Sequence, residues 1–213
     1  MQNSKADSMI DGKCVLVGGG DFCPSKFVRE TYGALVGVDS GYGYIKDLAK
    51  VDCVVGDFDS LGYVPDGVNV VKHDPIKDFT DLHLAIEYMR DKGYSEFVIF
   101  GGLGGRLDHT LSNIQTAYGF VKDGARIKFA DEKCDIEFIC DKKIFSGEAG
   151  ETFSLLAFDE CRGVNIVNGK YPLCDATLTN DYSIGVSNEF IGGDCEISVR
   201  QGILCFIRNT RKV

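Results

Sequence analysis

Two aspartates separated by one residue stand directly after a short apolar run of this chain. The run is Cys53–Val55, and the motif that follows it, over residues 56–60, reads Gly-Asp-Phe-Asp-Ser. Side chains two residues apart in an extended segment point the same way, so the carboxylates of Asp57 and Asp59 can converge. Converging carboxylate oxygens suit a hard cation such as Mg²⁺, which usually binds together with substrate phosphates. An ordinary acidic turn is the alternative interpretation.

A glycine-rich segment supplies the opposite kind of chemistry. Residues 101–109 read Gly-Gly-Leu-Gly-Gly-Arg-Leu-Asp-His. Glycines let backbone N–H groups approach an anion closely, and the helical segment that follows presents its N-terminus to the same place. Arg106 adds a fork of donors that fits phosphate oxygens, and His109 lies near the same helical face. We expect a phosphate cradle here, although a lone histidine is often only a structural residue.

Three further polar clusters follow apolar runs. Gly-Gly-Gly-Asp occupies residues 18–21, Asp39 opens an Asp-Ser-Gly motif, and Lys-Asp-Phe-Thr-Asp occupies residues 77–81. Each also has a structural interpretation: a tight turn for the glycines, and helix-cap or helix-dipole contacts for Asp39, Asp78 and Asp81. Ligands of open parallel sheets bind beyond the carboxyl ends of the strands, so five such clusters predict one site. Carboxylates that can hold a cation, placed opposite an anion-binding loop, are typical of sites for phosphoryl or pyrophosphoryl transfer.

The elements that position these clusters alternate between apolar runs and helical segments. The runs that favour strands are 14–17, 34–38, 53–55, 68–71, 97–100 and 127–129. One helix is expected to begin near Thr80 and another near Arg106. Their apolar faces are Leu82, Ala85, Ile86 and Met89 in the first and Leu107, Leu111, Ile114, Tyr118 and Val121 in the second. This alternation predicts an α/β domain with a mostly parallel sheet flanked by helices.

The pattern changes after about Asp131. Long helical segments disappear, and short β-type runs separated by glycines take over. Regular short strands with turn signals predict an antiparallel sandwich or barrel, and we expect the all-β sandwich. We therefore expect an α/β domain over residues 1–135 and a β-sandwich over residues 136–213.

Composition limits the classes of protein to which this chain can belong. Its 213 residues are 44% apolar and 26% charged, which fits one large or two small packed domains. A net charge of -9 argues against nucleic acid or an anionic membrane as the main partner. Nine scattered cysteines without a Cys-x-x-Cys pair predict a reduced, cytoplasmic protein. P-loop, Gly-x-Gly-x-x-Gly and Gly-x-Ser-x-Gly motifs are absent from the sequence.

Taken together, these motifs resemble those of the thiamine pyrophosphokinases. The matching segments, in family order, are residues 38–41, 56–60, 78–81, 101–109 with Leu111 and Asn113, and 183–189. The pair formed by Gly-Asp-Phe-Asp-Ser and Gly-Gly-x-Gly-Gly-Arg-x-Asp-His is specific. The resemblance implies an ATP-binding α/β domain, a thiamine-binding β-sandwich and a homodimer that shares the thiamine site between subunits. It implies transfer of pyrophosphate from ATP to the thiamine hydroxyl, giving thiamine diphosphate and AMP.

The resemblance also implies roles for individual residues. Mg²⁺ would be held by Asp57, Asp59 and Asp81, which with Arg106 and Asp108 form the catalytic group. ATP would be bound by Asp39, Gly102, Gly104, Arg106, His109 and Asn113. Thiamine would be bound by Asp78, Asp108, Ser187, Asn188 and Phe190. Asp78 and Asp108 are the candidates for accepting the hydroxyl proton.

Two departures from the family pattern concern the ligands. Ser40-Gly41 replaces a usual Gly-Gly, and the chain has no tryptophan to stack on thiamine, so Phe190 is the nearest aromatic substitute. Two other functions remain as alternatives. A metal-dependent nucleotide-sugar transferase also uses Asp-x-Asp, but it has no obvious use for the Arg-x-Asp-His cradle. A non-catalytic nucleotide- or thiamine-binding module is disfavoured by the intact set of acidic and basic residues.

Overall fold

The computed structural model describes residues 12–73, 79–182 and 184–210. The chain forms two compact units, Met1–Asp131 and Glu132–Val213. Strand β7 (Cys134–Ile139) lies entirely in the second unit, because all of its residues pair with β14 (Leu204–Asn209). The division between the units thus follows residue 131, close to the change of pattern seen in the sequence at about Asp131, whereas a division after residue 135 would cut this strand.

The first unit is built on a parallel sheet with the strand order β6-β5-β1-β2-β3-β4. Its strands are β1 (Cys14–Val17), β2 (Ala34–Val38), β3 (Cys53–Gly56), β4 (Asn69–Lys72), β5 (Glu96–Phe100) and β6 (Arg126–Ala130). Every residue of β1, β2 and β3 is buried, as expected for strands that are covered on both faces. The predicted parallel α/β sheet is confirmed.

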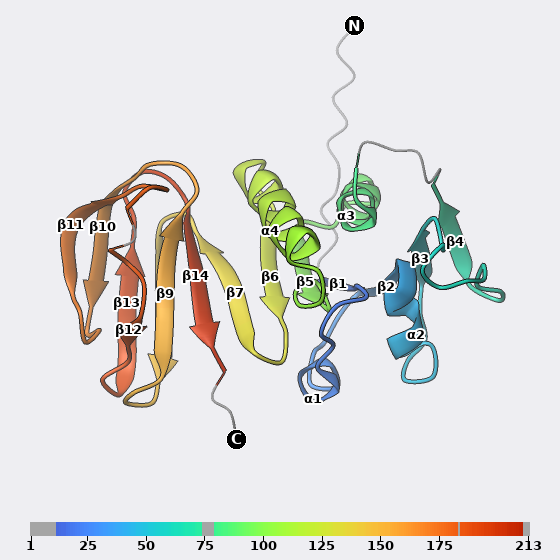
Figure 1. Cartoon of the computed structure of the whole chain (residues 1–213), viewed down its shortest axis with the longest axis horizontal. Helices are drawn as coiled ribbons and strands as arrows, with labels where there is room; N and C mark the ends of the chain where they lie inside the picture. The colour runs from blue at the N-terminus through green and yellow to red at the C-terminus, as the bar shows by residue number, and fades with distance from the viewer. Residues whose placement is uncertain (1–11, 74–78, 183, 211–213) are drawn as a thin grey trace, which may run out of the picture. The chain divides into compact units, whose positions relative to one another are not determined.

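Helices cover both faces of this sheet. They are α1 (Pro24–Phe27), the 3-10 helix η1 (Asp39–Gly41), α2 (Tyr42–Ile45), α3 (Asp81–Asp91) and α4 (Leu107–Lys122). Figure 1 shows α3 and α4 on one face of the sheet and α1 and α2 on the other. Phe27 of α1 and Ile45 of α2 pack with Val15, Val17 and Leu35 of the strands, which identifies the core on the second face.

Helix α3 follows its predicted pattern closely. The side chain of Thr80 accepts a hydrogen bond of 3.3 Å from the backbone N–H of His83, so Thr80 is the N-cap. The four predicted apolar residues, Leu82, Ala85, Ile86 and Met89, are all buried. A cap followed by this periodicity determines both where the helix begins and which face it buries.

The prediction of which face of α4 is buried is wrong for the first half of the helix. The side chains of Leu107 and Leu111 are 71% and 53% exposed. His109 and Asn113, which belong to the opposite stripe, line a cavity instead, and the same stripe continues into the buried Ala117. The inward face of α4 is therefore polar where it borders the cavity and apolar where it covers the sheet, a change that apolar periodicity cannot detect.

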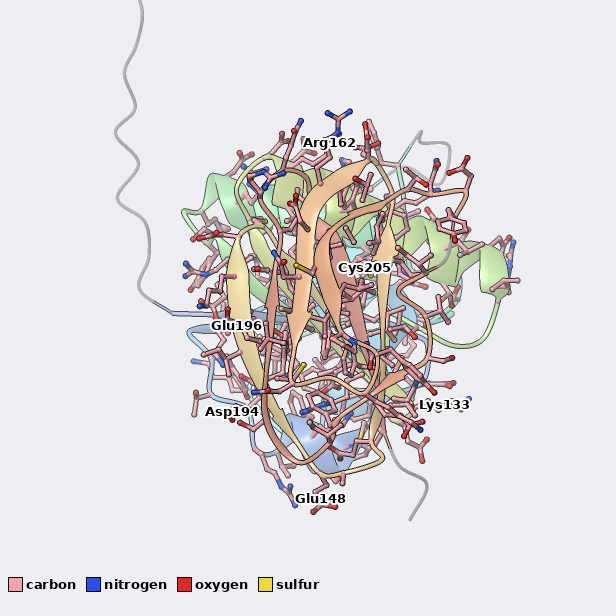
Figure 2. The ribbon with its side chains drawn as sticks, turned by 90° about the vertical axis from the view of Figure 1, so that its left-hand side faces the viewer. Lys133, Glu148, Arg162, Asp194, Glu196 and Cys205 are labelled. Carbon is pink, nitrogen blue, oxygen red and sulfur yellow. The ribbon has the colours of Figure 1, made fainter. Side chains whose placement is uncertain are left out.

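The second unit consists of antiparallel strands, as predicted. One group has the order β12-β9-β14-β7 and the other the order β11-β10-β13-β8. The remaining strands are β8 (Lys142–Gly147), β9 (Thr152–Ala157), β10 (Cys161–Val167), β11 (Leu173–Leu178), β12 (Asn188–Glu189) and β13 (Gly193–Ser198). Figure 2 faces this unit, with Arg162 of β10 near one end and Glu148, in the turn after β8, near the other.

Aromatic packing joins the two strand groups of the second unit. The ring of Phe145 in β8 stacks on Phe206 in β14, with 3.9 Å between the ring centroids. Phe153 and Phe190 extend the same core and are 0% and 1% exposed. Side chains that alternate inward along each strand thus form one shared core, which is the arrangement of a β-sandwich.

Two general features concern cysteines and membranes. All nine cysteines have free thiols, and burial raises the pKa of the Cys53 thiol to about 11, so that this thiol stays protonated. Across the part of the chain that the structure describes, no helix is both long enough and apolar enough to cross a bilayer.

Candidate active site

A cavity of about 480 Å³ lies in the first unit at the carboxyl ends of the parallel strands. Its walls come from the segments after β1, β2, β3 and β5 and from the N-terminal turns of α3 and α4. The predicted site residues that line it are Asp39, Asp57, Asp59, Asp81, Gly102, Gly104, Arg106, His109 and Asn113. The clusters that follow separate strands in the sequence are therefore brought to one place, as the topology of a parallel sheet requires.

A tight turn presents the first pair of carboxylates. Phe58 adopts a positive φ of 68° and is only 3% exposed, so its ring anchors the turn in the core. The backbone N–H of Asp59 donates a 3.1 Å hydrogen bond to Oδ1 of Asp57. Both aspartates follow β3, which ends at Gly56, as the sequence predicts, but they do not continue its extended conformation. It is the turn around a buried phenylalanine that allows both side chains to line the cavity.

Asp39 is the clearest indication of a missing partner in the cavity. Its Oδ1 atom is buried and has no hydrogen-bond partner among the described residues. The segment after β2 lies so close to β1 that a Cβ atom on Gly41 would be 2.0 Å from the carbonyl oxygen of Val17. Asp39 itself has a positive φ of 47°. A buried carboxylate oxygen without a donor is costly, so a cation or a ligand hydroxyl is expected to satisfy it.

The acidic wall suits Mg²⁺ that arrives with phosphates. Among the described residues, no three His, Cys, Asp or Glu side chains form a group that could hold a metal ion by themselves. Mg²⁺ does not need such a group, because it is often bound through one or two carboxylates together with substrate phosphates. Asp57, Asp59 and Asp81 line the same cavity as the unsatisfied oxygen of Asp39, and all four donors are carboxylates. The donor set therefore fits Mg²⁺.

The opposite wall is the glycine loop between β5 and α4. Gly101, Gly104 and Gly105 have φ values of 59°, 81° and 63°, which only glycine adopts easily. A Cβ atom on Gly102 would lie 2.7 Å from the Ile99 side chain, so no larger residue fits there without movement. Backbone atoms therefore make up most of this wall, and α4 begins immediately after it. Backbone N–H groups and a helix N-terminus together favour an anion.

Asp131 supports the glycine loop, although sequence reasoning did not select it. Its side chain is 2% exposed, and its two oxygens accept hydrogen bonds from the N–H groups of Gly101 at 2.7 Å and Leu103 at 3.0 Å. Burial raises the pKa of Asp131 to about 7. The available signal was its position, because Asp131 directly follows β6 and is thus one more polar residue at a strand end.

Asn113 also supports the loop. It was predicted to contact ATP, but its Nδ2 atom donates a 2.7 Å hydrogen bond to the carbonyl oxygen of Gly102. The hydroxyl of Thr110 donates to the carbonyl oxygen of Gly104 at 3.1 Å. The first turns of α4 thus bond two carbonyl groups of the loop, while Asp131 bonds two of its N–H groups, and both sets of contacts help to fix the cavity wall.

Arg106 and Asp108 form a two-point ion pair. Nε and Nη2 of Arg106 donate to the two carboxylate oxygens of Asp108 at 3.1 and 2.6 Å, and both side chains are exposed. The hydrogen bonds from Arg106 lower the pKa of Asp108 to about 2. Arg106 lines the cavity, whereas Asp108 is not among the lining residues. In this arrangement Asp108 orients the arginine and is a weak proton acceptor.

The predicted thiamine-binding residues of the second unit have different environments. Ser187 is exposed, has a positive φ of 61° and donates its backbone N–H to the Ser154 hydroxyl at 3.1 Å. Asn188 is 3% exposed, and its Oδ1 atom accepts from the N–H groups of Tyr171 and Glu189 at 3.0 and 2.8 Å. Its Nδ2 atom donates to the Tyr171 carbonyl at 2.7 Å. Asn188 therefore holds the chain around Tyr171 in place.

The prediction that Phe190 stacks on thiamine is wrong for this structure. The ring is 1% exposed and packs against Phe153, with 4.8 Å between the ring centroids. The Arg208 guanidinium lies 4.7 Å from its centroid, and Gly147 leaves space for the ring, since a Cβ there would be 2.3 Å from it. Phe190 is a core residue, so neither of its faces is available to a ligand. Asp78, the other predicted thiamine contact, lies outside the described residues.

Comparison with known proteins identifies the family of this chain. The family model described as "Thiamin pyrophosphokinase, catalytic domain" matches residues 30–129, and "Thiamin pyrophosphokinase, vitamin B1 binding domain" matches residues 140–204. The chain belongs to the thiamin pyrophosphokinase family. The curated thiamine pyrophosphokinase of Bacillus subtilis is 32% identical over 186 residues, which is 82% of this chain and 86% of that protein.

Solved thiamine pyrophosphokinases share the fold. The crystal structure of the Bacillus subtilis protein matches with a TM-score of 0.82 and 28% identity, covering 94% of this chain and all of that one. The yeast thiamin pyrophosphokinase matches with a TM-score of 0.74 at 14% identity, covering 96% of this chain and 88% of that one. Asp39, Asp57, Asp81 and Arg106 fall within the segment matched by the catalytic-domain model, and Asp131 lies two residues after its end.

Proposed function

We propose that this thiamin pyrophosphokinase transfers the terminal pyrophosphoryl group of ATP to the hydroxyl group of thiamine, giving thiamine diphosphate and AMP. Family membership supports the proposal. The observation that carries it is the cavity with an acidic wall on one side and a glycine loop with Arg106 and His109 on the other. A polyphosphate with a bound divalent cation would place the cation at the carboxylates and its phosphate oxygens at the glycine loop.

The cavity residues position and neutralise the triphosphate. Mg²⁺ held by Asp57, Asp59 and Asp81 would supply charge neutralisation on the phosphate oxygens. The glycine loop and the N-terminus of α4 bind phosphate oxygens through backbone N–H groups, and Arg106 and His109 add side-chain donors at the rim. Because the transition state of phosphoryl transfer is loose, this positioning provides most of the catalysis.

Proton transfer from the thiamine hydroxyl requires little help in such a reaction. Asp108 is anionic at neutral pH, because Arg106 lowers its pKa to about 2, and so weak a base accepts a proton poorly. We assign Asp108 the role of orienting Arg106. Asp78 remains the other candidate base, and it lies outside the described residues.

The second unit supplies the thiamine-binding surface in this proposal. Ser187 contacts thiamine through its exposed hydroxyl, while Asn188 acts indirectly by holding the backbone of Tyr171. Tyr171 is 55% exposed, and its ring is one of the aromatic surfaces that remain for stacking in place of Phe190. We further propose that the enzyme is a homodimer in which the thiamine site is shared between subunits, and that it acts in the cytoplasm.

Product analysis tests the proposal. Purified full-length protein is incubated with thiamine, ATP and Mg²⁺, and thiamine diphosphate and AMP are quantified together, with an EDTA control. Equal amounts of both products, lost with EDTA, are the expected result. AMP without thiamine diphosphate would keep the ATP site but mean that the pyrophosphoryl group goes to an acceptor other than thiamine. Neither product, from protein that still binds ATP, would favour a binding module.

A further inference from the structure

Hydrogen bonds hold both the carbonyl groups and the N–H groups of two residues in the glycine loop, Gly101 and Leu103. The carbonyl oxygens of Gly101 and Leu103 accept 2.8 Å hydrogen bonds from the N–H groups of Gly20 and Asp21. The N–H groups of the same two loop residues donate to Asp131. Both polar groups of Gly101 and of Leu103 are therefore engaged, and the peptide planes on either side of Gly102 cannot rotate without breaking these bonds.

The backbone N–H groups of the two later glycines of the loop can bind a ligand. Gly104 and Gly105 line the cavity, and within the described residues their N–H groups donate no hydrogen bond. Their direction depends on the segment before them, because a loop rich in glycine has little conformational preference of its own. Among the residues that the structure describes, Asp131 is the side chain that bonds two amides of that segment at once.

We propose that Asp131 is the positioning residue that sets the shape of the Gly101–Gly105 loop for the polyphosphate of ATP. The identity of this ligand rests on the proposed function. Asp131 does not touch the ligand in this account. It acts through the backbone, so that Gly104 and Gly105 present their N–H groups to phosphate oxygens without reorganisation.

The charge of Asp131 cannot be the reason for its presence. A carboxylate behind a phosphate site repels the ligand, so by charge alone its removal would tighten ATP binding. Asp21 adds negative charge beside it, while Lys26, which donates a 2.5 Å hydrogen bond to the Asp131 backbone carbonyl, opposes that effect. Weaker ATP binding after neutralisation of Asp131 would therefore have to come from loss of loop order.

The Asp131→Asn variant tests the proposal. The asparagine amide has one oxygen that can accept a hydrogen bond, whereas the aspartate has two. Its NH₂ group would face one of the two loop N–H groups, so at least one loop hydrogen bond is lost. We expect about tenfold weaker binding of ATP in the full-length protein, the change that follows from losing a hydrogen bond to a charged group. The KM for thiamine should not change. Glu132→Gln, at the exposed neighbouring residue, is the matched control and should bind ATP like the wild type.

Calorimetric titration with ATP and Mg²⁺ measures this affinity without requiring turnover. Equal or tighter ATP binding by Asp131→Asn would overturn the proposal. If the variant binds ATP weakly but the wild type forms no thiamine diphosphate, the role of Asp131 stands and the proposed function fails. The two results are thus distinguishable.

Amide hydrogen exchange of the wild type gives a second test that does not depend on the variant folding. The N–H groups of Gly101 and Leu103 should exchange much more slowly than those of Gly104 and Gly105, because only the first two are bonded to Asp131. Addition of ATP and Mg²⁺ should then slow exchange at Gly104 and Gly105. Exchange at Gly101 and Leu103 as fast as at the later glycines would show that the carboxylate does not hold the loop, and would overturn the proposal.

Discussion

Replacing Asn188 with alanine separates a structural role from a ligand contact. The family resemblance predicts that this side chain touches thiamine, but in the structure its two polar atoms make three hydrogen bonds of 2.7–3.0 Å to Tyr171 and Glu189. It is also 3% exposed. Alanine would leave the two backbone groups of Tyr171 and the Glu189 N–H without these partners. We therefore expect a loss of stability together with a displaced Tyr171 backbone.

The magnitude follows from the number of bonds. At about 1 kcal/mol for each hydrogen bond, the three bonds predict a loss of about 3 kcal/mol in the free energy of unfolding. For a chain of this length, that corresponds to a fall in Tm of roughly 6–12 °C. Thermal unfolding followed by circular dichroism measures it. Asn209→Ala, which removes a single exposed hydrogen bond to Thr152, is the matched control and should lower Tm much less.

Steady-state kinetics of the same variants completes this test. In Asn188→Ala we expect a raised KM for thiamine, since Tyr171 moves, and an unchanged KM for ATP, since the cavity of the first unit is untouched. A variant with wild-type Tm and a raised KM for thiamine would refute the reasoning. That result would mean that the Asn188 amide is not needed for the fold and contacts the ligand directly.

Three further predictions concern other residues. Asp57→Asn should lower kcat/KM by about a hundredfold or more, and His109→Ala by about tenfold, because a metal ligand contributes more than a single hydrogen-bond donor at the rim of the cavity. Equal losses in the two variants would contradict this ranking. Asp91→Asn, at the exposed end of α3, is the control. Burial raises the pKa of Asp131 from 3.8 to about 7, so the folded chain binds this proton more tightly and the free energy of unfolding should fall as pH rises between these values. In Asp131→Asn that fall should be smaller by up to about 4 kcal/mol in denaturant titrations, and an unchanged pH dependence would count against it. Phe190→Ala should cost about 3–5 kcal/mol in the free energy of unfolding while the folded protein keeps its affinity for thiamine; intact stability with lost affinity would return Phe190 to the ligand site.

Most of the fold could be predicted because local and tertiary signals agree. The strands of the first unit are buried on both faces and therefore appear as continuous apolar runs, and Thr80 with its periodic helix gives α3 directly. Helix α4 shows where such reasoning ends. Its exposed Leu107 and Leu111 look like a core face, while the true inward stripe begins with the polar His109 and Asn113.

The site was predictable in its place but not in its supporting contacts. Strand ends identify the cavity, since the parallel topology brings Asp39, Asp57 and the glycine loop together. Which side chains bond to protein rather than to ligand depends on contacts between distant segments. Asp131 bonds a loop residue 30 positions earlier in the chain, and Asn188 bonds Tyr171, 17 positions earlier, so neither role is visible in a local motif.

The fate of the β-phosphorus of ATP distinguishes pyrophosphoryl transfer from transfer of a single phosphoryl group. ATP labelled at that phosphorus is incubated with thiamine, Mg²⁺ and the full-length protein, and the products are separated and counted. Pyrophosphoryl transfer predicts label in thiamine diphosphate and an equal amount of unlabelled AMP, both abolished by EDTA and strongly reduced in Asp57→Asn. Formation of thiamine monophosphate and labelled ADP would mean that a single phosphoryl group is transferred and would contradict the account, as would the absence of any labelled thiamine product.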